Sequence, residues 1–153
     1  MSDPIRIVQV LPNGVGAVGS LTIPDAAPTT TKFLRDDATW GTAGYINIPQ
    51  NSQSGAYTTV LLDQGKHLLH PSADVTARTF TIDSNANVPY PIGTAITFVN
   101  QISAGVLTIA ITSDTMWLAG PGTTGSRTLA ANGVATALKI TATGWIISGT
   151  GLT

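Results

Sequence analysis

Short runs in which apolar and polar residues alternate dominate the chain from residue 56 onward. In 107–112, Leu107, Ile109 and Ile111 alternate with small or hydroxyl-bearing residues. Successive side chains of a β-strand point to opposite faces, so this spacing predicts strands that turn a large apolar face toward a core and a small polar face away from it.

Nine such runs follow one another at nearly even spacing, separated by Gly, Pro and Asn. They cover 57–62, 66–70, 77–82, 95–100, 106–112, 116–118, 128–129, 134–141 and 145–148. In 134–141, Val134, Leu138 and Ile140 share the face that we expect to pack on the core. Asn132-Gly133 predicts a type I′ hairpin turn, because both residues tolerate positive φ. The fold class expected for 56–153 is therefore all-β, an antiparallel β-sandwich of jelly-roll-like form.

The first 55 residues have a different character. An apolar, strand-like run at 5–11 is followed by glycine-rich sequence and a Pro/Thr stretch, which cannot bury a core of their own. We interpret 1–31 as an N-terminal attachment arm and linker that orders on a partner. Its candidate attachment residues are Ile5, Ile7, Val8 and Val10. Residues 32–55 form a connector between the arm and the β domain.

Composition narrows the classes of partner. Charged residues make up 10% of the 153 residues, none is glutamate, and the net charge is −1. No basic patch is present to collect phosphates, so nucleic-acid binding is not expected. No apolar run approaches the ~20 residues of a membrane helix, so membrane insertion is not expected either. A surface with few charges suits a chain that packs against copies of itself or another protein; a soluble monomer is the alternative.

No grouping of residues indicates catalysis, a metal or a cofactor. His67 and His70 would lie on opposite faces of a strand and so could not share a metal. The adjacent Asp36 and Asp37 are badly placed for a glycosidase pair, whose carboxylates must face one sugar from two sides. There is no cysteine and no Gly-x-Ser-x-Gly nucleophile elbow. We therefore expect a protein that is not an enzyme.

Two residues are candidates for sugar binding. Trp117 stands beside the glycine-rich loop 120–125 and offers an aromatic face to a sugar ring, with core packing as the alternative. Asp114, at the preceding turn, is the second candidate glycan-binding residue. Trp145, in an apolar run, is expected in the core or in a subunit contact.

One short motif resembles a known signature. Residues 32–40 read Lys-Phe-Leu-Arg-Asp-Asp-Ala-Thr-Trp, which resembles the Phe-Leu-Arg-Gly-Asp-Gly-Thr-Trp signature of fibre and appendage proteins of tailed bacteriophages. The sequence departs from it at Asp36 and Ala38, where the family usually has glycine. The stretch 127–149, with Leu-x-x-Asn-Gly before a tryptophan-bearing last strand, resembles the closing hairpin of many phage appendage domains.

The resemblance implies a homotrimeric structural protein of the virion, assembled in the host cytoplasm. Phe33, Leu34, Trp40 and Tyr45 would form the subunit interface of the connector, and the arm would attach to the major capsid protein or another virion protein. A head fibre or capsid decoration protein is favoured by the short chain. A short tail fibre or receptor-binding tip that recognises host surface glycan is the alternative, and a depolymerase is a third class.

Overall fold

The computed structural model describes residues 32–34, 40–42 and 47–153. By its internal contacts the chain divides into two compact units, Met1–Ile46 and Asn47–Thr153. In the first unit, β1 (Lys32–Leu34) and β2 (Trp40–Thr42) form a two-stranded antiparallel sheet.

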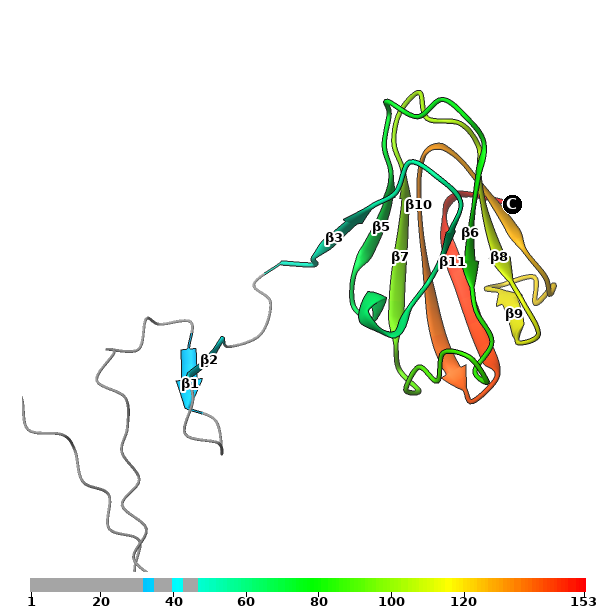
Figure 1. Ribbon diagram of the computed structural model, residues 1–153. Helices are drawn as coiled ribbons and strands as arrows, with labels where there is room; N and C mark the ends of the chain where they lie inside the picture. The colour runs from blue at the N-terminus through cyan, green and yellow to red at the C-terminus, as the bar shows by residue number, and fades with distance from the viewer. Residues whose placement is uncertain (1–31, 35–39, 43–46) are drawn as a thin grey trace, which may run out of the picture. The chain divides into compact units, whose positions relative to one another are not determined.

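The regular secondary structure of the second unit is almost entirely β (Figure 1). Its one other regular element is the short 3-10 helix η1 (Leu61–Asp63). Within the described residues, no helix is long and apolar enough to cross a membrane. The strands are β3 (Gln50–Ser52), β4 (Tyr57–Thr58), β5 (His67–His70), β6 (Arg78–Ile82), β7 (Ala95–Asn100), β8 (Leu107–Ile111), β9 (Thr115–Leu118), β10 (Arg127–Thr141) and β11 (Gly144–Leu152).

These nine strands form one mixed sheet. Its order is β3-β5-β7-β10-β8-β6-β4, with β11 paired to β10 and β9 paired to β11. The ladders β3–β5, β5–β7, β4–β6, β6–β8 and β9–β11 are parallel, whereas β10 is antiparallel to β7, β8 and β11. The all-β class is thus confirmed. The expectation of purely antiparallel pairing is wrong, and a jelly-roll arrangement is not confirmed.

The parallel ladders follow from how the chain alternates between two halves of the sheet. After β5 the chain crosses to β6 on the other side of β10, and after β7 it crosses to β8. The paired residues of β5 and β7 are 30 positions apart in sequence and those of β6 and β8 are 29 apart. Parallel neighbours need a crossover connection, and here a strand of the opposite half supplies it.

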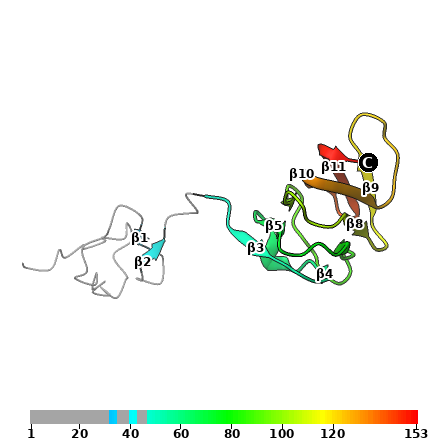
Figure 2. The same cartoon turned by 90° about the horizontal axis from the view of Figure 1, so that it is seen from above.

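The sheet curls around a single core. Phe80 of β6 contacts the ring of His70 on β5 at a centroid distance of 6.2 Å, although β5 and β6 lie on opposite sides of β10 in the strand order. Phe80, Ile82, Leu107 and Ile109 are fully buried, which confirms the predicted alternation in β6 and β8. Viewed from above, β3 and β5 lie at one side of the domain and β10 and β11 at the other (Figure 2).

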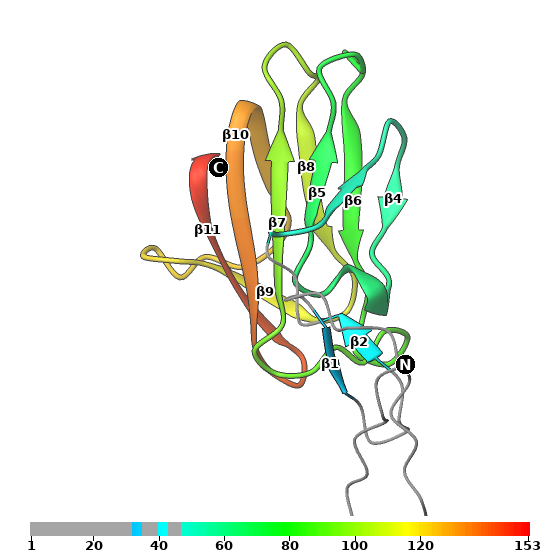
Figure 3. The same ribbon diagram turned by 90° about the vertical axis from the view of Figure 1, so that its left-hand side faces the viewer.

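Strand β10 belongs to both halves. Its residues Arg127–Leu129 pair with β8 and its residues 133–138 pair with β7 (Figure 3). Between these segments the register shifts, and Asn132 has φ of 61°. The predicted hairpin turn at Asn132-Gly133 is therefore wrong: positive φ is used for a β-bulge inside one long strand. A side chain at Gly133 would come within 2.7 Å of the Ala130 carbonyl oxygen, so this bend needs glycine.

The two faces of β10 are opposite to those expected from its sequence. Ala135, Ala137 and Lys139 are buried, whereas Val134, Leu138 and Ile140 are 46%, 39% and 42% exposed. The reason lies in the neighbouring strands, which place large buried residues beside the inward alanines. Ala135 pairs with Phe98, and Ala137 lies between Ile96 and Ile147. Since these residues fill the interior beside positions 135 and 137, only small side chains fit at those two positions, and Val134, Leu138 and Ile140 point outward.

Candidate functional site

The predicted interface and attachment residues lie in the first unit. Ile5, Ile7, Val8, Val10 and Tyr45 fall outside the described residues. The other three predicted residues belong to the β1–β2 ladder. Leu34 pairs with Trp40, and Phe33 pairs with Gly41. The backbone therefore places the two halves of the 32–40 signature opposite one another.

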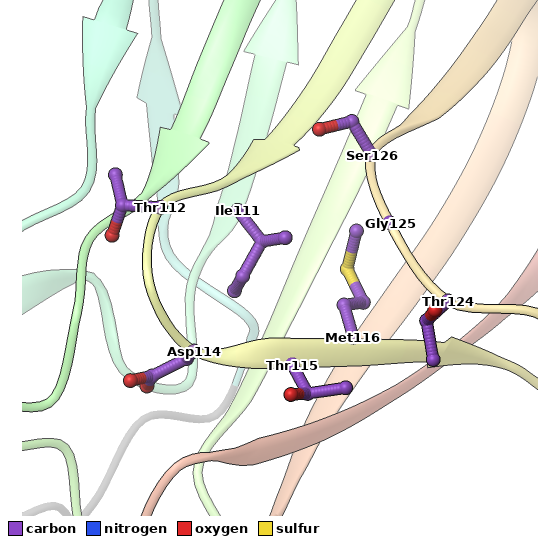
Figure 4. A pocket seen from close by; sticks show the side chains of 8 residues that line it. All are labelled: Ile111, Thr112, Asp114, Thr115, Met116, Thr124, Gly125 and Ser126. Carbon is purple, nitrogen blue, oxygen red and sulfur yellow. The ribbon is translucent and has the colours of Figure 1, made fainter.

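The predicted glycan-binding region contains a pocket of about 300 Å³ beside β9 (Figure 4). Four hydroxyl side chains, two apolar ones, a carboxylate and a glycine line it. They are Thr112, Thr115, Thr124, Ser126, Ile111, Met116, Asp114 and Gly125. In Figure 4 the side chains of Ile111 and Met116 lie between the two chain segments that form the walls. Hydroxyl groups around an apolar floor are suited to hydrogen-bond and cover part of a sugar.

The loop after β9 folds back on that strand and forms one wall of the pocket. The Leu118 N–H donates to the Thr123 carbonyl (2.8 Å), and the Gly125 N–H donates to the Met116 carbonyl (3.1 Å). The Arg127 guanidinium also donates to the Thr123 hydroxyl (3.1 Å). This loop is therefore held by several hydrogen bonds, so the wall is preformed.

Of the two predicted sugar-binding residues, Asp114 lines the pocket and Trp117 does not. The Asp114 carboxylate accepts hydrogen bonds from the Asn85 N–H at 3.2 and 3.1 Å, and only 9% of the residue is exposed. Trp117 is half-buried against Gly144, where an added Cβ would come within 2.8 Å of its ring. The structure thus gives each residue a packing or hydrogen-bonding role within the domain.

A second region, on the outer side of the sheet, escaped the sequence analysis. Strands β5, β7, β10 and β11 run side by side, and their outward residues form an uncharged surface, here called the outer face. Its first row is Leu69, Val99, Val134 and Thr150, its second is His67, Thr97, Thr136 and Ser148, and its third is Ala95, Leu138 and Ile146. Ile140 extends it along β10. The signal that could have revealed this face is the pair of alanines at 135 and 137, because small residues at alternate positions of β10 mark the side that points inward.

None of these positions carries Asp, Lys or Arg. The Thr97 and Thr136 hydroxyls hydrogen-bond to each other across the β7–β10 ladder at 3.0 Å, which satisfies polar groups within the face. His67 lies on this side and His70 is buried on the other, as the strand spacing predicts. An uncharged surface with exposed aliphatic side chains can be covered by another protein without leaving a charge unpaired.

The interior contains a polar network around His70. Its Nδ1 lies 2.9 Å from Asn100 Oδ1, and its Nε2 lies 3.2 Å from Asp74 Oδ2, although not in hydrogen-bond alignment. The Asp74 carboxylate accepts hydrogen bonds from Arg78 Nε (2.7 Å) and Nη2 (3.2 Å). These bonds hold the pKa of the Asp74 carboxyl well below its ordinary value, against the opposing effect of burial. The network links β5, β6 and β7, so its role is structural.

No group of three or more potential metal-ligating His, Cys, Asp or Glu side chains occurs in the described residues. The comparisons with known proteins add no family: neither the protein-family models nor the curated proteins gave a match. The resemblance of residues 32–40 to the phage appendage signature therefore stays a prediction.

Proposed function

We propose that this protein is a structural component of a tailed-phage virion. It acts as a homotrimeric head fibre or capsid decoration protein, attached through its N-terminal arm, with the β domain of Asn47–Thr153 projecting from the particle. The proposal assigns it no enzymatic activity. The observation that carries self-association is the outer face of β5, β7, β10 and β11, which supports contact with further copies of the same chain.

The outer face is suited to self-association because it has no charge to repel its own copy. Like charges brought together across an interface are costly, and a neutral surface avoids this cost when identical copies meet. Val134, Leu138 and Ile140 are each about two-fifths exposed. Completing their burial would contribute roughly 1 kcal/mol per side chain. Three copies would together bury nine of these aliphatic side chains.

The oligomeric state of the full chain in solution tests this proposal. Light scattering coupled to size exclusion should give three times the chain mass of 15.7 kDa. The variant Leu138→Lys should reduce the mass to that of a single chain with unchanged far-UV circular dichroism. Val75→Lys is the matched control, because Val75 is 74% exposed in the β5–β6 connection and should leave the trimer intact. A folded single chain for the wild type would contradict the proposal.

The location on the particle is tested by copy number. Quantitative mass spectrometry of purified virions should find hundreds of copies relative to the capsid subunit if the protein decorates the head. A handful of copies would favour the alternative, a short tail fibre or receptor-binding tip.

The pocket beside β9 is the observation that supports a receptor-binding role. Its four hydroxyl groups and its apolar floor are suited to a host surface glycan. Binding on a glycan array should then be lost in the double variant Thr124→Ala, Ser126→Ala. The exposed Thr58, on β4 and outside the pocket lining, provides the control Thr58→Ala, which should retain binding. Equal binding by both variants would exclude the pocket as the glycan site.

A further inference from the structure

Lys139 is a buried lysine on the inner face of β10. Only 1% of the residue is exposed, and its Nζ lies 5.4 Å from the centroid of the buried Trp145 ring. The Nζ donates a hydrogen bond to the side-chain oxygen of Asn85 at 2.7 Å. A buried primary amine is therefore held against the side-chain amide of a half-buried asparagine.

The surroundings make this amine easier to deprotonate than an exposed lysine. Burial lowers the pKa of the Lys139 ammonium, and the charge of Asp114 acts more weakly in the opposite direction. Among the described residues, the ion pairs within 4.0 Å involve Lys66, His70 and Arg78 and leave Lys139 without a carboxylate partner. An amine that is desolvated and has no counter-ion loses its proton more readily, and the free amine is the form that attacks a carbonyl carbon.

A carboxyl group lies beside the same asparagine. Both carboxylate oxygens of Asp114 accept from the Asn85 N–H, at 3.2 and 3.1 Å. The turn that carries Asn85 is itself fixed, because the N–H groups of Asn87 and Val88 both donate to the Ser84 carbonyl, at 3.1 and 2.9 Å. Lys139 and Asp114, from two separate segments, thus both contact Asn85, the first at its side-chain oxygen and the second at its backbone N–H. The charge of Asp114 also acts on the Lys139 amine. The amine and the amide therefore have the proximity that such a reaction needs.

We propose that Lys139 and Asn85 form an intramolecular isopeptide bond, with Asp114 as the residue that transfers the proton. The neutral Nζ attacks Cγ of Asn85, and a tetrahedral intermediate forms. One proton passes from Nζ through the Asp114 carboxyl to Nδ2, the Cγ–Nδ2 bond breaks, and ammonia leaves. One C–N bond forms and one breaks, so nothing is oxidised or reduced and no co-reactant is needed.

The bond would tie the loop after β6 to β10 across the interior. These segments are 54 residues apart in the chain, and β6 and β10 are not neighbours in the sheet, since β8 lies between them. A cross-link of this length restricts the unfolded chain in the same way as a disulfide. It needs no oxidising compartment, which suits a chain without cysteine. The inference does not depend on the proposed function.

The mass of the full-length protein tests the proposal. Intact-mass measurement of the denatured wild type should fall below the sequence mass by about 17 Da, the mass of the ammonia lost. Proteolytic digestion should yield a branched peptide that joins the Asn85 and Lys139 segments. A wild-type protein that keeps its full sequence mass after prolonged incubation in the folded state would overturn the proposal.

Variants separate this bond from other losses of ammonia. Lys139→Met keeps an unbranched side chain in the interior and should restore the full mass, and Asp114→Asn should form the bond slowly or not at all while the fold is retained. Two variants are controls: Asn87→Ala changes another asparagine of the same turn, and Lys66→Ala changes another lysine of the domain. Both should keep the mass deficit of the wild type. A deficit that survives in Lys139→Met would show cyclisation of an asparagine on its own backbone and would also overturn the proposal.

Discussion

His70 and Asn100 are joined inside the domain by a hydrogen bond of 2.9 Å between Nδ1 and Oδ1. The Asn100 amide group also donates to the carbonyls of Gly105 and Leu129, each at 2.9 Å. Because its nitrogen makes both of these bonds, its oxygen must be the acceptor, and His70 carries its proton on Nδ1. One buried side chain thus connects β5, the turn before β8, and β10.

Replacing Asn100 with alanine is expected to destabilise the domain strongly. The variant Asn100→Ala leaves the buried Leu129 carbonyl, the partly buried Gly105 carbonyl and the His70 N–H without their partners, so the free energy of unfolding should fall by about 3 kcal/mol. Urea denaturation followed by tryptophan fluorescence measures this. Asn87→Ala removes an exposed amide that bonds Asp83 at 3.2 Å and should change the stability by less than ~0.5 kcal/mol. Similar losses in the two variants would contradict the role given to Asn100.

Asp74 is expected to make the stability depend on acid pH. Its hydrogen bonds from Arg78 lower the pKa of the folded carboxyl, so its contribution is fully present above the unfolded value near 4 and is lost as the pH falls toward the folded value. The variant Asp74→Asn should therefore be less stable than the wild type at pH 7, and the difference should narrow toward pH 2. A difference that stays constant between pH 7 and pH 2 would refute this account.

Tyr90 is expected to make the stability of the domain depend on alkaline pH. Burial raises the pKa of its phenol to about 12, and its hydroxyl donates to the Val60 carbonyl at 2.5 Å. The contribution is present below the unfolded value near 10 and is lost as the pH rises from there toward 12. Tyr90→Phe should cost about 1 kcal/mol at pH 7 and flatten the decline of stability between pH 9 and pH 12. Thermal unfolding across that range measures it, and an unchanged alkaline slope would count against it.

Gly105 is required by a close backbone approach. A methyl group there would collide with the backbone of Thr76 and come within 2.6 Å of the Ala77 nitrogen. Gly105→Ala should therefore lower the free energy of unfolding by roughly 2 kcal/mol. At Gly55, by contrast, an added Cβ meets no atom within 4 Å, so Gly55→Ala should be neutral or slightly stabilising. Calorimetry of the two variants compares them directly, and equal melting temperatures would show that the backbone can move apart at Gly105.

The sequence predicted the strands better than their pairing. The run 95–100 coincides with β7, and the runs at 66–70, 77–82 and 106–112 differ from β5, β6 and β8 by a single residue at one or both ends. Alternation is a local signal, so it locates the strands. It also identifies the buried face of a strand, except where the side chains of the adjacent strands force the opposite face inward. It does not reveal the parallel order, because that depends on partners about 30 residues away.

Strand β10 shows why local rules failed at the candidate sites. Asn132-Gly133 has the composition of a hairpin turn, but β7 and β8 each need a partner, and one continuous strand with a bulge serves both. The large residues beside Ala135 and Ala137 decided which face points inward. The composition of the outer face and the burial of Lys139 both follow from this orientation of β10 in the tertiary structure. Asp114 was singled out because it sits at a predicted turn between two runs, while its contact with Asn85 joins turns 29 residues apart.

The sharing of β10 has a consequence for synthesis of the protein. Until residues 127–138 have left the ribosome, β7 and β8 have no antiparallel neighbour, and both present open edges. The strands β3 to β9 should therefore remain without stable structure, and exposed to mispairing, until β10 has been made. Folding of the β domain would then follow the synthesis of β10 and complete both halves of the curled sheet together.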